Sequence, residues 1–289
     1  MNARVLAYHS HHVVGDDYPR NDHVAFRTDL DLIADLGCEI VSLDTLVDRF
    51  FGGKSDHDDE RVQVAITFDD GPIYDVEGFT HPRFGAQRGF LGIMRDFVAA
   101  RGSRAQPGLS ATSFVIASAE ARQVIEATYD AAYTYVGPGA MTDAWWNGAI
   151  DSGLIAIGNH SWDHLHPALP RVAHSRQARG DFTQVLSVED ADAQIADAAR
   201  AIAAQTNGRN APYFAFPFGQ YNGFLVEEYL PGNGERLGLR AAFTDEPKPI
   251  TGRESRWCLP RYICGHHWRS PAELRAILEA GWLRDGPRR

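Results

Sequence analysis

The stretch Val64–Pro72 reads VAITFDDGP, and it shapes the interpretation of the whole chain. Its first five residues form a short apolar run that is typical of a buried strand. Asp69 and Asp70 follow directly, and then come Gly71 and Pro72, which favour a turn. Two adjacent carboxylates at the end of a buried strand are costly unless a cation neutralises them, so the stretch indicates a divalent metal site. A simple turn is the alternative, and this stretch alone does not decide between the two.

Short apolar runs recur along the chain and alternate with helical segments. The runs of strand length begin at Val5, Glu39, Val64, Thr112, Leu154, Tyr213, Ala241 and Arg261. Residues 25–37, 90–102 and 188–208 have the apolar spacing of amphipathic helices. This alternation predicts an α/β protein whose parallel sheet is closed or nearly closed into a barrel. A barrel of this kind accommodates 289 residues, so we expect one domain over residues 1–289.

The third helical segment carries recognisable boundaries. Ser187, with Asp190 three residues later, approximates a capping box. Gly208 is a plausible glycine at the end of the same helix.

Residues 73–110 make a long connection between two of the expected strands. The segment carries several aromatic, histidine and proline residues, namely Tyr74, Phe79, His81, Pro82, Phe84 and Phe90. Long loops at the carboxyl ends of barrel strands usually build the substrate side of a site. We therefore expect a loop insertion at 73–110 that contacts substrate, and a packing role remains the open alternative.

Composition and charge narrow the classes of function. Apolar residues make up 44% of the chain and charged residues 23%, which is ordinary globular usage, so the chain can bury a sizeable core. The formal net charge of -10 argues against a nucleic-acid partner, because phosphate binding relies on clustered Lys and Arg.

The start of the sequence and its cysteines indicate where the protein is located and whether its thiols are paired. The start, MNARVLAYHSHHVV, lacks the long apolar stretch of a signal peptide, and no apolar run reaches the length of a membrane span. If this is the native start, we expect a cytoplasmic protein. The cysteines Cys38, Cys258 and Cys264 lack CxxC spacing, so we interpret them as buried structural thiols.

A second motif strengthens the metal interpretation. The expected strand LIAIGN leads into HSWDH, which places His160 and His164 four positions apart. Two imidazoles just past a strand can converge on one ion, and they suit zinc and similar metals. With one carboxylate, they leave coordination positions open for water and substrate, as in catalytic sites.

Together, TFDDGP and HSWDH resemble the first two motifs of the NodB-homology polysaccharide deacetylases, carbohydrate esterase family 4. Further stretches, including LAYHS, ATSFV, FAFPFGQYN and AAFTDEP, are similar to the bacterial exopolysaccharide N-deacetylase subgroup and extend the resemblance over most of the chain. The resemblance implies a distorted (β/α) barrel of seven or eight strands. It also implies Asp69 as general base, and Asp70, His160 and His164 as metal ligands.

The third motif departs from the common family pattern. Pro217, Phe218 and Gly219 resemble its end, and the resemblance implies that the backbone N–H of Phe218 helps to hold the developing oxyanion. Ala215 stands where the family has an arginine, so the residue that orients the base must come from elsewhere. We expect Arg261 in this role, and a surface ion pair is the alternative.

The general acid is a second point of departure. Most family members use a histidine in a late motif, and here only His266 and His267 fall near that place, in a poorly matching setting. The exopolysaccharide subgroup implies instead the histidine of an amino-terminal Tyr-His pair, which corresponds to His9. We favour His9.

The resemblance implies hydrolysis of an N-acetyl group on an amino sugar in a polysaccharide, an oligosaccharide or its nucleotide- or lipid-linked precursor, with release of acetate. The expected partner is thus a carbohydrate or another small amide. The expected cofactor is a divalent metal; the ligand set favours Zn²⁺, although iron, cobalt or nickel would fit it. Deformylases, cyclic amide or imide hydrolases on the same scaffold, and a noncatalytic carbohydrate-binding protein remain alternatives.

Overall fold

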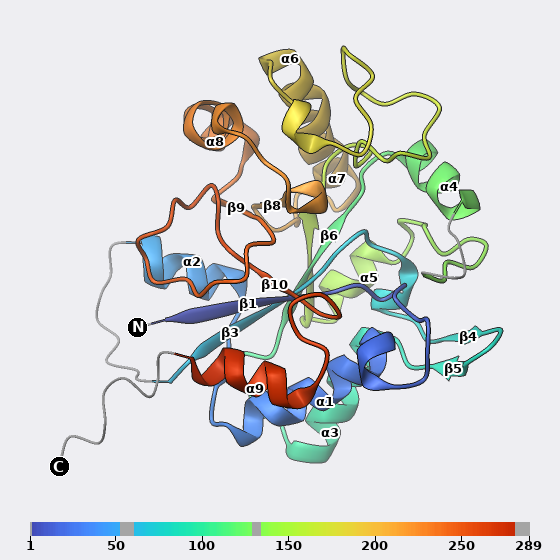
Figure 1. Ribbon diagram of the computed structural model, residues 1–289, viewed down its shortest axis with the longest axis vertical. Helices are drawn as coiled ribbons and strands as arrows, with labels where there is room; N and C mark the ends of the chain where they lie inside the picture. The colour runs from blue at the N-terminus through green and yellow to red at the C-terminus, as the bar shows by residue number, and fades with distance from the viewer. Residues whose placement is uncertain (1, 53–60, 129–133, 281–289) are drawn as a thin grey trace.

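A parallel sheet forms the centre of the computed structural model, which describes residues 2–52, 61–128 and 134–280 (Figure 1). The strand order is β10-β1-β3-β6-β7-β8-β9, and β2 pairs with β3 beside this path. The strands are β1 (Ala3–Tyr8), β2 (Glu39–Ile40), β3 (Gln63–Phe68), β6 (Ala111–Val115), β7 (Ile155–Asn159), β8 (Tyr213–Ala215), β9 (Ala241–Phe243) and β10 (Tyr262–Ile263). A separate hairpin consists of β4 (Phe79–His81) and β5 (Gly85–Gln87), which are antiparallel.

The segment before β10 brings the two edges of the sheet together. Leu259 makes a parallel bridge to Phe243 of β9, and Tyr262 pairs in parallel with Leu6 of β1. The sheet therefore curls towards closure, and the prediction of a distorted (β/α) barrel is confirmed.

Helices cover the outside of the curled sheet. They are α1 (Asp22–Asp35), α2 (Leu43–Phe51), α3 (Phe90–Arg101), α4 (Ala119–Thr128), α5 (Trp146–Asp151), α6 (Val188–Ala191), α7 (Asp197–Gln205), α8 (Leu230–Leu237) and α9 (Pro271–Glu279). Short 3-10 turns span Tyr18–Arg20, Ile73–Asp75, Phe182–Gln184 and Pro217–Gly219, and π-helical turns span Asp192–Ala196 and Phe224–Tyr229. In Figure 1, α1, α3 and α9 gather on one side of the sheet, with α6, α7 and α8 on the other.

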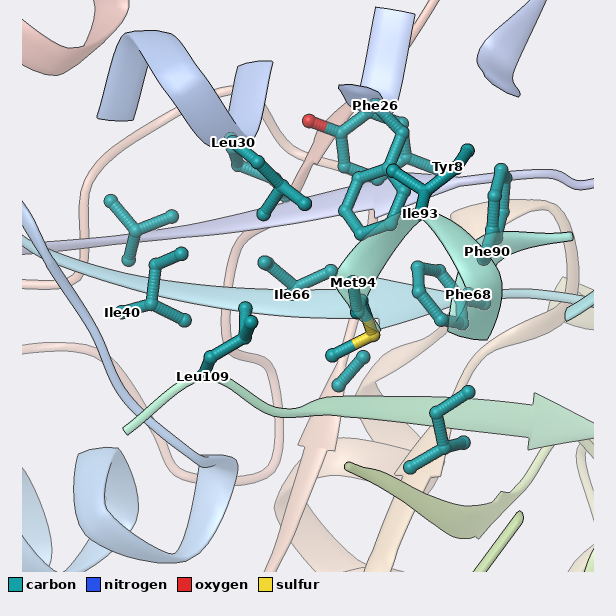
Figure 2. Close-up of a cluster of buried hydrophobic side chains, with 14 of the residues drawn as sticks. Tyr8, Phe26, Leu30, Ile40, Ile66, Phe68, Phe90, Ile93, Met94 and Leu109 are labelled. Atoms are coloured by element: carbon teal, nitrogen blue, oxygen red, sulfur yellow. The ribbon is translucent and has the colours of Figure 1, made fainter. Parts of the chain in front are cut away.

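Side chains of alternate strand residues enter different layers of the core. Outside the barrel, Tyr8 and Phe68 pack against helical residues such as Phe26 and Phe90, with ring centroids 5.0 Å apart for Tyr8–Phe26 and 4.6 Å for Phe68–Phe90 (Figure 2). Inside it, the residues are smaller on average. Ala3, Val5, Ala65, Ala215 and Ala241 share the interior with Phe114 and Phe243. This period of two is what a strand imposes, and the small interior residues allow the sheet to curl tightly.

The expected strand at Glu39 is shorter than its apolar run. It ends at Ile40, because Ser42 already begins α2 and its side chain accepts a hydrogen bond from the Thr45 N–H at 3.1 Å. Gln106 holds this short strand in place. Its side chain accepts from the Ile40 N–H and donates to the Cys38 carbonyl, both at 2.8 Å.

The expected helix at 188–208 is present but is interrupted by the π-helical turn at Asp192–Ala196. Its predicted cap is confirmed, since the Ser187 side chain accepts from the Asp190 N–H at 3.1 Å. Gly208 was expected in the first position after the cap, but Thr206 is the cap and Asn207, with φ of 56°, takes that position. Gly208 follows one residue later with φ of 73°, and its N–H donates to the Ala203 carbonyl at 2.7 Å.

Residues 73–110 contain a 3-10 turn, the β4–β5 hairpin and α3, which forms the crossover between β3 and β6. The hairpin therefore supplies the extra structure of this connection.

Cys38 and Cys264 are buried, whereas Cys258 is half-buried because it follows the exposed residues Ser255 and Arg256, and all three thiols are free. Across the residues that the structure describes, no helix has the length and apolar character needed to cross a bilayer.

Candidate functional site

The carboxyl ends of the strands bring the predicted residues into one cavity. His9 follows β1, Asp69 and Asp70 follow β3, and His160 follows β7. The cavity has a volume of about 200 Å³ and is lined by His9, Asp69, Asp70, His160, His164, His166, Phe218 and Asp245. Because all these strands are parallel, their ends lie at the same edge of the sheet, where barrels place their sites.

Asp70, His160 and His164 converge as metal ligands would. One carboxylate oxygen of Asp70, Oδ1, lies 3.6 Å from His160 Nε2 and 3.5 Å from His164 Nε2. The ligand atoms of all three residues lie within 4.8 Å of one another. His160 Nδ1 is 2.9 Å from the Ala215 carbonyl, which can only accept, so Nδ1 carries the proton and Nε2 offers a lone pair. This donor set fits a divalent cation.

Electrostatics favour the metal-binding protonation states of His164 and Asp70. Burial lowers the pKa of His164 to about 3, so its imidazole is neutral. Burial also opposes ionisation of Asp70, but attraction to the surrounding histidines in their protonated form outweighs it at low pH and holds the pKa of Asp70 below its usual range. The cluster is thus a carboxylate with neutral imidazole, which is the form that binds a cation.

Asp69 is clamped by Arg261, and both side chains are almost fully buried. The guanidinium donates to Asp69 Oδ1 and Oδ2 at 2.8 Å each, and it also donates to Asp245 Oδ1 at 2.8 Å. Burial raises the pKa of Asp69, but the charge of Arg261 dominates and leaves that pKa below its usual value. Asp69 is therefore a fixed carboxylate at neutral pH, beside the metal ligands.

The backbone is strained at these positions. Asp70, Ser161, His164 and Phe218 have φ of 71°, 74°, 62° and 58°, in the left-handed region that non-glycine residues seldom adopt. Such strain persists only where the surrounding structure enforces it, and it clusters at functional sites.

The π-helical turn at Asp192–Ala196 supports the loop that carries both histidines. Gln194 accepts from the Trp162 N–H through its carbonyl at 2.8 Å, and its side chain donates to Asp163 Oδ1 at 2.8 Å. Asp163 in turn accepts from the Leu165 N–H at 3.0 Å. A π-helical turn frees carbonyls from the helical ladder, and here one of them serves the loop.

The histidines considered as general acid occupy different places. His9 lines the 200 Å³ cavity, and His266 lies with His9, Phe218 and Asp245 around a neighbouring cavity of about 630 Å³. His267 lines neither; its Nδ1 accepts from the Ile263 N–H at 2.8 Å. Of the two late histidines, only His266 is therefore near the site.

Three residues of this region were missed by the sequence interpretation. Asp245 lies two residues after the end of β9 and shares Arg261 with Asp69, and an acid this close to a strand end was an available signal. His11 Nε2 lies 3.5 Å from the second oxygen of Asp70, and His166 lines the cavity. Neither histidine has a signal in the sequence beyond its proximity to a motif.

Part of the sequence is similar to a known protein family. A family model described as "Polysaccharide deacetylase" matches residues 105–230. This part of the chain is similar to polysaccharide deacetylases. The matched segment includes His160, His164 and Phe218, whereas Asp69, Asp70 and Arg261 lie outside it. No curated protein matches the sequence.

Solved structures of several deacetylases share the fold of this chain. Streptococcus pyogenes deacetylase PplD, in complex with acetate, aligns with a TM-score of 0.62 at 16% identity over 96% of this chain and 99% of that chain. IcaB from Ammonifex degensii aligns with a TM-score of 0.60 at 17% identity, over 96% and 97%. The BpsB deacetylase domain from Bordetella bronchiseptica aligns with a TM-score of 0.53 at 16% identity, over 91% and 96%.

Proposed function

We propose that this protein is a metal-dependent N-deacetylase, which hydrolyses the N-acetyl group of an amino sugar and releases acetate. The substrate class is a polysaccharide, an oligosaccharide or its nucleotide- or lipid-linked precursor. The observation that carries the proposal is the convergence of Asp70, His160 and His164, with Asp69 held as a carboxylate beside them. The deacetylase-family match and the deacetylases of the same fold support it.

Asp70, His160 and His164 would hold the metal, and Zn²⁺ suits two imidazoles and one carboxylate. A bound divalent ion supplies polarisation of the acyl carbonyl and a lowered pKa for water. Asp69 accepts the proton of the attacking water, and the clamp from Arg261 fixes the direction of its oxygens.

His9 and Phe218 complete the reaction at the opposite ends of the scissile amide. His9 donates a proton to the leaving amine, and its place in the same cavity allows this. The backbone N–H of Phe218 stabilises the developing oxyanion. Thr244 donates to the Gly219 carbonyl at 2.7 Å, which anchors the turn that presents Phe218.

The adjoining cavity of about 630 Å³ is suited to the rest of the sugar substrate. Its lining includes Thr183, Gln220, Tyr221 and Glu246, whose polar groups can form hydrogen bonds with sugar hydroxyl groups. The ring of Tyr221 can also pack against a sugar face. It shares His9, Phe218 and Asp245 with the smaller cavity, so a substrate placed here reaches the metal ligands.

Acetate release from a panel of N-acetylated sugars, nucleotide sugars and short oligosaccharides tests the proposal. The enzyme is stripped with a chelator and then reloaded with zinc, cobalt, nickel or iron. Release that disappears on stripping and returns with a metal supports a metal-dependent deacetylase, and the panel ranks substrates. Metal binding without acetate release from any sugar contradicts the proposal and favours another amide substrate or a binding role.

A further inference from the structure

Another cavity lies on the other side of the metal-binding loop. It has a volume of about 390 Å³ and is lined by Ser118, Glu120, Ala121, Val124, Trp162, Asp163 and residues 169–173. It shares no lining residue with the cavity that holds Asp70. Trp162 and Asp163 belong to the loop between His160 and His164, so this loop separates the two cavities.

The wall around Trp162 is rigid. The Trp162 carbonyl accepts from the Ser118 N–H at 2.8 Å, and the Trp162 N–H donates to the Gln194 carbonyl at 2.8 Å. Asp163 is also fully engaged, because its Oδ2 accepts from the Ala173 N–H at 2.6 Å and its Oδ1 accepts from Gln194 at 2.8 Å. A pocket held in this way is preorganised, so a ligand would bind without ordering the wall.

The side chains that could recognise a ligand are not used by the fold. Glu120 and Arg171 are exposed, and within the described part of the chain neither makes an ion pair or a side-chain hydrogen bond. Trp162 is half-buried, and its indole likewise has no hydrogen-bond or ring partner among residues 2–52, 61–128 and 134–280. One aromatic ring, one carboxylate and one guanidinium therefore remain available around a single cavity.

We propose that this cavity is a second, noncatalytic binding site for a neutral sugar unit. The face of Trp162 would pack against the apolar face of a pyranose ring. Glu120 would accept hydrogen bonds from hydroxyl groups, and Arg171 would donate to hydroxyl or acetamido oxygens. Opposite charges at the rim cancel, so an uncharged polar ligand is favoured over an anion or a cation. This site goes beyond the proposed catalytic function and would bind sugar whether or not the metal cavity is active.

Heteronuclear NMR on the full chain tests the site directly. The indole N–H signals are recorded during titration with tri-N-acetylchitotriose, with a chelator present so that no turnover occurs. The Trp162 signal is assigned from its loss in Trp162→Phe. We expect that signal to shift and saturate with millimolar affinity. Glu120→Gln and Arg171→Ala should each weaken the affinity about tenfold, because each removes a hydrogen bond from a charged group.

Arg95→Ala is the matched control, since Arg95 is also exposed but lies on α3, away from the cavity. It should leave the affinity unchanged. The highest sugar concentration in the titration, about 20 mM, lies well above the expected millimolar dissociation constant. If the Trp162 signal does not shift up to that concentration, the proposed sugar site is wrong. Equal affinities in Arg171→Ala and Arg95→Ala overturn it as well. Because Glu120 and Arg171 are exposed, their replacement does not disturb the fold.

Discussion

Arg261 is the residue on which the chemistry at Asp69 depends. It is fully buried, contacts Asp69 with two parallel hydrogen bonds and shares a third with Asp245. One cation between two carboxylates leaves a net negative charge beside the metal ligands. Without the guanidinium of Arg261, the carboxylates of Asp69 and Asp245 would lose the positive charge that they share.

Arg261→Met should therefore destabilise the protein strongly. Removing one partner of a buried ion pair costs about 3–5 kcal/mol, because the remaining charge stays buried. The free energy of unfolding from urea denaturation measures this. Arg240→Met is the control. Arg240 pairs with Asp44 at 2.9 Å and also with Asp48, with 38% of its side chain exposed, and each exposed pair is worth less than about 1 kcal/mol. Equal losses in the two variants would contradict the account of Arg261.

His11 should tune the metal site without binding the ion. It contacts the oxygen of Asp70 that faces away from His160 and His164, with Nε2 3.5 Å from Oδ2. Residues that orient a ligand typically change metal affinity about tenfold or more when they are replaced. We expect His11→Asn to weaken zinc binding by about that factor, measured by competition with a chromogenic chelator.

His12 provides a neighbouring control for that experiment. It contacts Asp22 at 2.7 Å rather than Asp70, so His12→Asn should leave zinc affinity unchanged. Unaltered affinity in His11→Asn would mean that Asp70 is held without it.

At the level of elements, the helical segment from Val188 to Gln205 covers the sheet and also holds the metal-binding loop in place. Its π-helical turn directs Gln194, which is fully buried, into the metal-binding loop. The side-chain amide donates to both Asp163 Oδ1 and the Ala173 carbonyl at 2.8 Å. The loop geometry is thus fixed by an element far away in sequence.

Gln194→Met tests that support with little change in volume. It removes both hydrogen bonds and leaves buried acceptors with fewer partners, so we expect a loss of about 2 kcal/mol in the free energy of unfolding. Gln205→Met, at the exposed end of α7, should change stability by less than about 0.5 kcal/mol. Similar values for both variants would show that Gln194 does not hold the loop.

Some elements of the fold and site were predictable from the sequence, and others were not. The eight strand runs and the motifs after them were predictable, because apolar runs and strand-end acids are local signals. The π-helical turn was not, since it depends on contacts with a distant loop. Asp245 was missed for a related reason: its importance lies in sharing Arg261 with Asp69, and this pairing appears only when the strands are placed side by side.

At the scale of the whole molecule, the two ends of the described chain are joined through β1. It lies between β10 and β3, and α9 packs against α1. Asp29 connects the same regions, since its carboxyl group accepts hydrogen bonds from Tyr8 at 2.9 Å, Tyr18 at 2.5 Å and the indole of Trp268 at 3.3 Å. Closure of the barrel therefore involves a buried titratable group.

Burial raises the pKa of Asp29 from 3.8 to about 7. The folded protein thus keeps a proton that the unfolded chain loses, and the free energy of unfolding contributed by Asp29 falls as pH rises from about 4 to about 7. Asp29→Asn removes this dependence. We expect the variant to gain stability relative to wild type as pH rises from about 4 to about 7, measured by urea denaturation. A constant difference would contradict the raised pKa.

The most direct test of the central claim compares zinc content and acetate release in wild type and Asp69→Asn, with Asp96→Asn as a surface control. Asp96 is 56% exposed, and among the residues that the structure describes it pairs with Arg88 alone. We predict that all three proteins bind one zinc and that Asp69→Asn alone loses acetate release, by about 10²–10⁴-fold, as expected for removal of a general base. Acetate release that persists in zinc-loaded Asp69→Asn would contradict the role of Asp69 and the mechanism built on it.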